Sequence, residues 1–461
     1  MISTLQSPSI AEQITDQAFA LDVNAIPAAV RTRIEELMID VVGLCVAARN
    51  TDYIKALLAG VDSGGPATAI GHKATYSPET AAMINGCAAH GEDFADTFEG
   101  GPVHSSAVIM PAVLAACERF GCDGKAAFKG IVVGIETLCR LSMVIPKAIH
   151  KSGFHPTAVL GAMAATLAVS VTMGLNRKQT VDALGIAGSM ASGIIEYLAE
   201  GAWTKRLHAG WAAKIGIQAA RLGQQGFLGP RTVFEGTHGF YYAFARNAGG
   251  DYKVLTEDFG MLWYTNAITF KPYATGTMNQ PYVDCALRLA KHLSKRGITA
   301  EDVTDILCET AEGYVHRLWD PLPSKHRPAN DYAAKFSAPF NIAVAFITGS
   351  AGIAAFTEKT VRDERILALS SKVRYVVDPN NPYPKAYTGH VRMTLKDGSV
   401  VEERQGHIRG GAQEPLTRAE IEDKFRLNAG FGGWNAKQIE DFRRNAVKIF
   451  DGKVDLAALR G

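Results

Sequence analysis

The sequence is short of net charge and of paired cysteines. Its 48 lysines and arginines almost balance 46 acidic residues, which leaves a net charge of +2, and no run of like charges forms a tail. This balance provides no electrostatic field that would attract nucleic acid. The seven cysteines are odd in number and include no C-x-x-C pair. They favour reduced thiols in a cytoplasm and argue against an iron–sulfur cluster or a structural zinc site.

Signals for targeting, nucleotide binding and covalent catalysis are also missing. Residues 1–7 carry neither a basic n-region nor an apolar h-region, so we expect no signal peptide. The sequence contains no P-loop, no G-x-G-x-x-G fingerprint and no signature of an activated serine or cysteine nucleophile. A long uncharged stretch, Pro156 to Gly174, consists mostly of small residues. It predicts a buried helix inside a bundle rather than a membrane span.

What the sequence does contain is a series of amphipathic helical patterns. Hydrophobic residues make up 47% of the 461 residues, which suffices for one large domain or two ordinary ones with a buried core. Pro27 stands at the start of a first helix. Apolar residues then recur at helical spacing in Glu79–Ala89, Ala107–Phe120, Lys125–Met143, Arg177–Ala187 and Gly210–Gln225. Alanine dominates these segments, so we expect a closely packed all-α bundle up to about Phe227.

The pattern changes after about Phe270. Val373–Asp378 is typical of a strand, and Val391–Arg404 alternates apolar and polar residues on both sides of Asp397-Gly398. This alternation predicts a β-hairpin with a type I′ turn. Helical patterns in the same region cover Tyr282–Leu293 and Asn341–Thr348.

We therefore predict a mainly α protein, a large all-α helical bundle domain with an inserted smaller α+β lid domain. The first part of the helical domain comprises residues 1–268, and the lid comprises residues 269–410. Residues 411–461, which open with the capping box Thr417–Glu420, return to the helical domain as C-terminal helices. A cleft between two such domains is a common place for a small-molecule site.

The segment from His90 to His104 carries the densest acid/base chemistry of the chain. His90, Asp93 and Asp96 are spaced by three residues, so on a helix they would share one face. A glycine-rich loop, Glu99 to Pro102, then leads to His104. The set fits a metal site, a proton-transfer site or a helix end that merely caps the loop.

Two further clusters stand at predicted helix starts. His155 precedes Pro156, so its ring lies near the positive end of a helix dipole, which favours a neutral imidazole and suits an anionic ligand. Lys205, Arg206 and His208 open an Ala/Gly-rich helix, where they are placed to hold carboxylates. The alternatives are a histidine that only caps its helix and a basic turn that is only solvated.

Near the predicted domain junction, Lys271 precedes Pro272 and is therefore on extended backbone. Tyr314 is a further candidate acid. The complete inventory of histidine, aspartate, lysine, arginine and tyrosine suits proton transfer next to a carboxylate. Cations would hold an anionic substrate while one group removes a carbon-bound proton and another group donates one.

Five blocks in order resemble the MmgE/PrpD family, and the resemblance covers nearly the whole chain. The blocks are His90 to His104, Gly153-Phe-His-Pro-Thr-Ala158, Lys205-Arg-Leu-His-Ala-Gly-Trp211, Lys271-Pro-Tyr273 and Ala334-Lys-Phe-Ser-Ala-Pro339. The resemblance implies a helical domain plus a smaller lid domain, usually dimeric. It also implies action on small di- or tricarboxylates without a metal or an organic cofactor.

The resemblance also implies roles for residues. In the decarboxylase branch of the family the active-site positions match Asp93, His104, His155, Lys205, Lys271 and Tyr314. We expect Asp93 and His104 to handle protons, with Tyr314 as an acid. We expect the substrate to be bound by His155, Lys205, Arg206, His208 and Lys271.

Two departures bear on the substrate. Ala95 stands where many members have a second Asp, and Ser105-Ser106 follow His104 where many have Pro. The leading expectation is a cytoplasmic, homodimeric lyase that dehydrates a 2-methylcitrate-like acid. Epimerisation of an iminodisuccinate-like acid and decarboxylation of a cis-aconitate-like acid remain alternatives. A metallohydrolase and a helical interaction protein are alternatives of another class.

Overall fold

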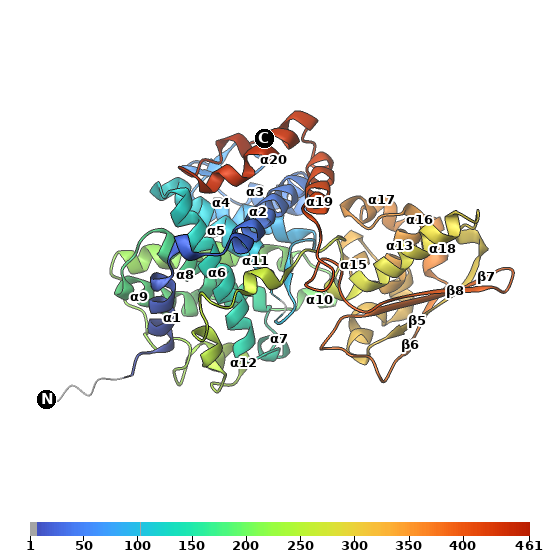
Figure 1. Ribbon diagram of the computed structural model, residues 1–461, viewed down its shortest axis with the longest axis horizontal. Helices are drawn as coiled ribbons and strands as arrows, with labels where there is room; N and C mark the ends of the chain where they lie inside the picture. Colours follow the sequence, from blue (N-terminus) through green and yellow to red (C-terminus); the bar gives the residue numbers. More distant parts are fainter. Residues whose placement is uncertain (1–6, 102) are drawn as a thin grey trace. The chain divides into compact units, whose positions relative to one another are not determined.

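The computed structural model describes residues 7–101 and 103–461. Most of the segment considered for a signal peptide, and Pro102 of the predicted loop, lie outside these residues. The chain forms two compact units (Figure 1). Unit 1 contains residues up to Gly91, then Ala95–Ile268 and Ile421–Gly461, and unit 2 contains Glu92–Phe94 and Thr269–Glu420. The predicted mainly α fold class is confirmed.

Unit 1 is a bundle of α-helices. Its helices are α1 (Ile10–Ala20), α2 (Ala28–Ala48), α3 (Asp52–Ala59), α4 (Pro78–Gly91), α5 (Ser106–Phe120), α6 (Gly124–Val144), α7 (Ala148–Lys151), α8 (Pro156–Thr172), α9 (Arg177–Met190), α10 (Tyr197–Glu200), α11 (Thr204–Gln224), α12 (Phe240–Ala245), α20 (Ala436–Asn445) and most of α19 (Arg418–Phe431). Short strands accompany them: β1 (Ala67–Thr68), which pairs antiparallel with β2 (Thr75–Tyr76), then β3 (Thr97–Phe98) and the first residue of β4 (Ile268–Thr269). The bundle brings the starts of α5, α8 and α11, and the end of α4, into one interior.

Small residues allow the central helices to approach closely. Helix α11 packs against α4, α5, α8 and α9, and α8 also packs against α6. At the contact of α4 with α11, a Cβ on Gly210 would lie 2.0 Å from the Met83 carbonyl oxygen, and one on Gly86 would lie 2.6 Å from the Gly210 Cα. Neither position admits a larger side chain. The two glycines therefore set the spacing of the helices that carry His90 and the basic group of α11.

Helix α8 begins at Pro156, as predicted, with His155 as its N-cap. Every residue of α8 except Val171 is buried, and α8 packs against five other helices of unit 1, namely α1, α5, α6, α9 and α11, so the small side chains serve helix packing. None of the helices in the described part of the chain is both long and apolar enough for a membrane crossing.

The expectation that His90, Asp93 and Asp96 share one helix face is wrong. Helix α4 ends at Gly91, and Asp93 has a φ of 54°, in the left-handed region. The spacing of three residues places side chains on one face only while the backbone stays helical. Asp93 and Asp96 therefore do not continue the face of α4 that carries His90.

Unit 2 is built on a four-stranded sheet. The strands are β5 (Val303–Thr310), β6 (Val373–Val377), β7 (Gly389–Leu395) and β8 (Val400–Gln405), and their order is β6-β5-β7-β8. Strand β5 runs parallel to β6 and antiparallel to β7, and β7 pairs antiparallel with β8. Strand β6 confirms the strand predicted at Val373–Asp378.

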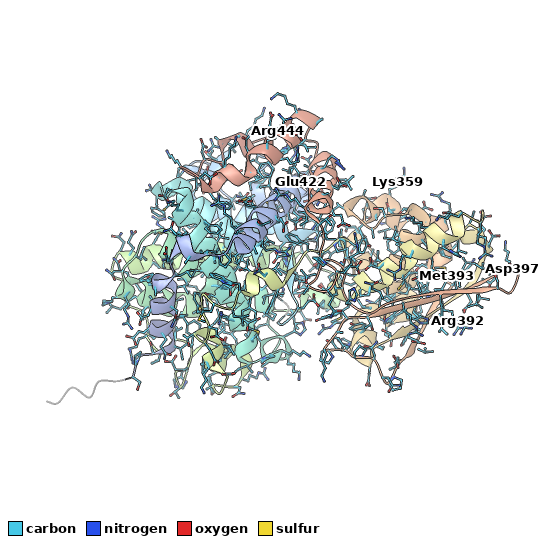
Figure 2. All side chains as sticks on the ribbon, in the orientation of Figure 1. Lys359, Arg392, Met393, Asp397, Glu422 and Arg444 are labelled. Atoms are coloured by element: carbon cyan, nitrogen blue, oxygen red, sulfur yellow. The ribbon has the colours of Figure 1, made fainter. Side chains whose placement is uncertain are left out.

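The predicted hairpin is confirmed, but its predicted turn type is wrong. Thr394 pairs with Val400, and only Gly398 of the connecting residues has a positive φ, at 81°. The Gly398 N–H donates to Leu395 O and the Leu395 N–H to Ser399 O. A type I′ turn needs positive φ at two residues, whereas a three-residue loop that ends on a left-handed glycine needs one. Asp397 marks the tip (Figure 2).

The sheet of unit 2 is covered by helices on one side, as Figure 1 shows. Helix α13 (Gln280–Ser294) packs against β7 and β8, α16 (Ala338–Thr348) packs on α13, and α18 (Glu364–Ser370) packs on α16. Three short helices complete the unit: α14 (Leu322–His326), α15 (Asp331–Ala334) and α17 (Glu358–Val361). Met393 on β7 is fully buried, whereas Arg392 beside it is exposed, so side chains alternate across the sheet as the period of two predicts.

Candidate active site

Three buried histidines meet inside unit 1. His90 comes from the last turn of α4, His104 from the loop before α5 and His155 from the N-cap of α8. The ring centroids of His90 lie 4.8 Å from those of His104 and 5.7 Å from those of His155. One ring nitrogen from each histidine lies within 4.8 Å of the others. We call this group the histidine cluster.

The backbone orients the ring of His104. The Nδ1 atom of His104 lies 2.7 Å from the carbonyl oxygen of Asp96. The backbone N–H of His104 donates to the Thr157 hydroxyl at 3.2 Å. A carbonyl oxygen only accepts, so Nδ1 carries the hydrogen, and in the neutral ring the lone pair lies on Nε2. The carbonyl also stabilises a protonated ring, since Nδ1–H donates in both states. If the ring of His104 takes up a proton, the nitrogen that accepts it is therefore Nε2.

Asp96 holds the loop that carries His104. Its carboxylate accepts from the backbone N–H and the hydroxyl of Ser105 at 3.0 and 2.8 Å, and from the N–H and hydroxyl of Ser106. Burial nevertheless raises the pKa of Asp96 above its usual value. Asp96 caps the start of α5 rather than facing a metal. The two serines, which looked like a departure from the family, are what Asp96 binds.

His155 forms a pair with His208, whose Nδ1 lies 3.1 Å from its own Nδ1. One ring must donate and the other accept, so the two imidazoles have opposite tautomers. Burial lowers the pKa of His155 well below its usual value, and the neighbouring His90 and Lys205 lower it further. Burial and Lys205 also lower the pKa of His208 to about 4. The predicted neutral state of His155 follows chiefly from burial rather than from the helix dipole.

The basic group that opens α11 is buried, so the alternative of a solvated turn is wrong. Lys205, Arg206 and His208 are each less than a tenth exposed. The Arg206 guanidinium lies over the ring of Tyr53, 4.3 Å from its centroid, which stabilises a buried cation by its attraction to the ring face. Three cationic or titratable side chains therefore reach the interior of unit 1 from one helical turn.

In unit 2, Lys271 and Asp93 form a buried ion pair. The Lys271 Nζ lies 2.7 Å from a carboxylate oxygen of Asp93 and also donates to the Asp93 carbonyl at 3.0 Å. The two side chains are 1% and 2% exposed. A buried pair of this kind keeps both groups charged only while both are present. The structure therefore brings together two residues that the sequence places in separate clusters.

A second buried lysine, Lys335, was not among the predicted site residues. Its Nζ lies 3.1 Å from a carboxylate oxygen of Glu92, donates to the carbonyl oxygens of Glu92 and Ala274, and lies over the Phe356 ring. Lys271 and Lys335 thus hold adjacent residues of the segment Glu92–Phe94. The signal in the sequence was the block Ala334–Pro339, but nothing local pairs Lys335 with Glu92.

Replacing Lys335 with methionine is expected to destabilise the protein by about 3–5 kcal/mol, because it leaves the Glu92 carboxylate buried without its cation. Denaturant unfolding of the full chain measures the change. The paired variant Lys335→Met/Glu92→Gln removes both charges and should recover most of the loss. A single variant as stable as the wild type would show that the ion pair contributes nothing to stability.

Tyr314 lies in a tyrosine group of unit 2. Its ring centroid is 4.8 Å from that of Tyr383 and 6.5 Å from that of Tyr387. Burial raises the pKa of Tyr314 far above its usual value, so its hydroxyl stays protonated near neutral pH and can donate or accept a hydrogen bond. Its role as an acid stays a prediction.

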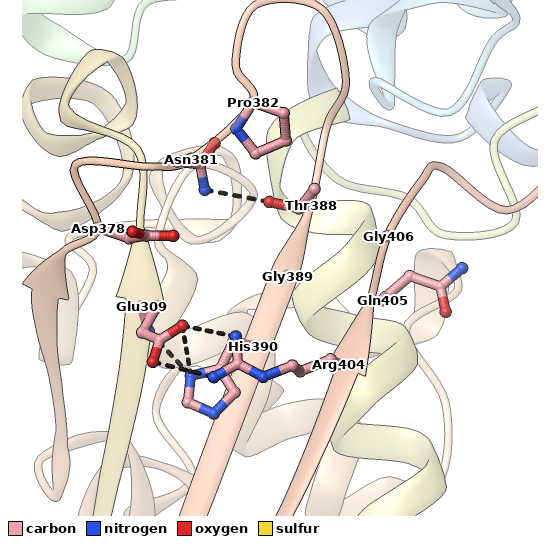
Figure 3. Close-up of a pocket in the computed structure, with 10 residues that line it drawn as sticks. All are labelled: Glu309, Asp378, Asn381, Pro382, Thr388, Gly389, His390, Arg404, Gln405 and Gly406. Carbon is pink, nitrogen blue, oxygen red and sulfur yellow. Dashed lines mark hydrogen bonds and ion pairs between the residues drawn. The ribbon is translucent and has the colours of Figure 1, made fainter.

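A separate hollow of unit 2, drawn in Figure 3, contains none of the predicted site residues. Its volume is about 190 Å³ and it lies beside β5, β7 and β8. Its charged groups already have partners in the protein, since Arg404 pairs with Glu309 at 2.5 Å and His390 Nδ1 accepts from the Glu309 N–H at 3.2 Å. The candidate site therefore rests on the buried groups described above, and this hollow adds no group to it.

Comparison with known proteins gives a consistent family. The sequence profile of the MmgE/PrpD N-terminal domain matches residues 12–252, and that of the MmgE/PrpD C-terminal domain matches residues 273–446. Cis-aconitate decarboxylase of Homo sapiens is 29% identical over 76% of this chain and 73% of its own length. The Aspergillus terreus cis-aconitate decarboxylase is 27% identical over 96% and 94%. Mitochondrial 2-methylcitrate dehydratase of Yarrowia lipolytica is 27% identical over 53% and 48%.

Proposed function

This chain belongs to the MmgE/PrpD family, and from that membership we propose that it is a lyase that decarboxylates a cis-aconitate-like unsaturated tricarboxylate. The relatives named cis-aconitate decarboxylase match 76–96% of the chain, whereas the 2-methylcitrate dehydratase of Yarrowia lipolytica matches 53%. Decarboxylation therefore takes precedence over the dehydration that the sequence alone favours.

The observation that carries the proposal is the fixed ring of His104 beside a buried cationic group. A carboxylate one saturated carbon away from a carbon–carbon double bond loses CO2 in a simple sequence. The bond to the leaving carboxylate breaks, its electron pair becomes a new double bond, and the original π electrons take a proton at their far carbon. The reaction thus needs one positioned proton donor and cations for the remaining carboxylates.

The residues of the chain supply these two requirements. We assign donation of the proton to Nε2 of the protonated His104. The Asp96 carbonyl stabilises that protonated ring by accepting from Nδ1–H. Within unit 1 we assign carboxylate binding to His155, Lys205, Arg206 and His208. For unit 2 taken by itself, Lys271 is the carboxylate-binding group that the family resemblance implies. Arrival of an anionic substrate favours the protonated imidazoles, which offsets the lowering of the pKa by burial.

In unit 2, Asp93 acts in the proposal through Lys271, because its carboxylate holds the ammonium group charged and in place. Tyr314 is assigned as a neutral donor, since burial keeps its hydroxyl protonated. No metal or organic cofactor is required by this scheme. The family resemblance implies most of these residues, while Arg206 and His208 are added from the basic group that opens α11. The role of Asp93 is changed by its ion pair.

Dehydration of a 2-methylcitrate-like acid is the second candidate. It needs a base for a carbon-bound proton and an acid for the leaving hydroxyl group. The His155–His208 pair favours it, because in two imidazoles of opposite tautomers joined through Nδ1 one Nε2 has a lone pair and the other has a hydrogen. The 2-methylcitrate dehydratase among the relatives is the second observation in its favour.

Nuclear magnetic resonance in D2O tests the two candidates and the epimerase alternative in parallel. The protein is incubated with cis-aconitate and, separately, with 2-methylcitrate and an amino dicarboxylate. We expect release of CO2 from cis-aconitate and one new C–D bond in the product. Alkene formation with loss of water from 2-methylcitrate alone would establish the dehydratase. Deuterium uptake with an unchanged carbon skeleton would establish the epimerase.

A further inference from the structure

The histidine cluster has the composition of a transition-metal site. His90, His104 and His155 are all buried, and each offers one ring nitrogen within 4.8 Å of the other two. They come from three different elements, so the fold rather than a local motif brings them together. Within residues 7–101 and 103–461, these three histidines are the one set of three or more potential metal-ligand side chains whose ligand atoms lie this close together.

The carboxylates of the same segment do not belong to this ligand set. Asp96 binds Ser105 and Ser106, and Asp93 pairs with Lys271. The metal alternative considered from the sequence, with His90, Asp93, Asp96 and His104 as ligands, therefore has the wrong members. An all-imidazole set favours zinc, cobalt, nickel or copper over magnesium, calcium and manganese, which prefer oxygen.

Hydrogen bonds prepare two of the rings for a metal. A metal-binding imidazole usually donates its second N–H to a carbonyl or carboxylate, which orients the ring and fixes its tautomer. His104 donates its Nδ1–H to the Asp96 carbonyl in this way, and His155 has His208 as its partner at Nδ1.

The spacing of the nitrogens also fits, after a small closure. Tetrahedral zinc with Zn–N bonds of about 2.0–2.1 Å separates its ligand nitrogens by roughly 3.4 Å. Nitrogens within 4.8 Å of one another reach that geometry when the rings move by on the order of 1 Å. Three protein ligands leave a fourth position open for water or for an anion.

We propose that His90, His104 and His155 bind one divalent transition-metal ion, represented by Zn²⁺, and that the bound ion inhibits the enzyme. The ion would occupy the nitrogen of His104 that is assigned to the proton. It would also add positive charge where the reacting group must sit. The inhibition rests on the proposed function, whereas the binding of the ion does not.

Binding is tested on the full-length protein after treatment with a chelator. Calorimetric titration with Zn²⁺ should show one ion per chain, and Co²⁺ should give the visible absorption of a tetrahedral nitrogen site. His90→Asn, His104→Asn and His155→Asn should each weaken binding by at least about 10- to 100-fold, the loss caused by removing only a supporting residue. His238→Gln, an exposed histidine of unit 1, is the control and should bind as the wild type does.

X-ray absorption of the zinc-loaded wild type keeps the test valid if a variant fails to fold. It should report three imidazole ligands and one further light atom. Binding that is unchanged in the folded variants, or a zinc shell without three imidazoles, would overturn the site. Stoichiometric zinc that leaves turnover unchanged or raises it would overturn the inhibition. Zinc binding in a protein that turns over no tested polycarboxylate would refute the proposed function and leave the metal site standing.

Discussion

Replacing His104 with glutamine is expected to lower kcat for the polycarboxylate substrate by about 10²- to 10⁴-fold, the usual contribution of a general acid or base. The side chain of glutamine keeps the size and a hydrogen-bond donor for the Asp96 carbonyl, but it cannot exchange a proton near neutral pH. The expected loss of kcat is therefore specific to proton exchange at Nε2. The Asp96 carbonyl accepts from Nδ1–H and so stabilises the ring when Nε2 is protonated.

The readout separates a catalytic from a structural role. Steady-state kinetics should show the loss in kcat with KM changed much less, and the pH profile should lose the limb that belongs to the imidazole. Thermal unfolding should stay close to that of the wild type, with His238→Gln as the matched control. A variant that keeps a third or more of the wild-type kcat would remove His104 from the mechanism.

Replacing Lys271 with methionine is expected to have the second large effect, on stability and activity together. The substitution leaves the Asp93 carboxylate buried without its cation, which costs about 3–5 kcal/mol. It also removes an assigned carboxylate-binding group. We expect the free energy of unfolding in urea to fall by this amount and kcat/KM to fall by at least about 30-fold, since the loss of a charged partner costs about 2–5 kcal/mol in binding and about 1.4 kcal/mol is a factor of ten.

A paired variant distinguishes the two effects of Lys271. Lys271→Met/Asp93→Asn removes both charges, and asparagine tolerates the left-handed backbone of Asp93. Stability should largely return while activity stays low. Lys359→Met, at an exposed lysine of the same unit (Figure 2), should change neither quantity. Recovery of activity in the paired variant would show that Lys271 only neutralises Asp93 and does not bind substrate.

Much of the fold follows from local signals. The predicted helix starts at Pro156 and the capping box at Thr417–Glu420 agree with the structure, because a helix start depends on a few adjacent residues. Strand β5 was not predicted, although it lies between β6 and β7 in the sheet. Its residues alternate poorly, and its strand form depends on partners far away in the sequence.

The candidate site divides in the same way. The candidate residues could be recognised from the sequence, because few segments contain so many acid/base and cationic side chains close together at predicted helix starts. The partners were not: Lys335 meets Glu92 and Arg206 meets Tyr53 across long separations in sequence. Burial decides the pKa of His155 and His208, and burial is a property of the packed bundle rather than of the segment.

Local sequence patterns are enough to predict the helical character of the chain, the hairpin in unit 2 and the candidate residues for proton transfer and carboxylate binding. The grouping of those residues follows only from the folded chain. Because α4 ends at Gly91 and Asp93 takes a left-handed backbone, the residues spaced by three separate into different partnerships. Asp93 joins Lys271, Asp96 joins the serines before α5, and His90 joins His104 and His155.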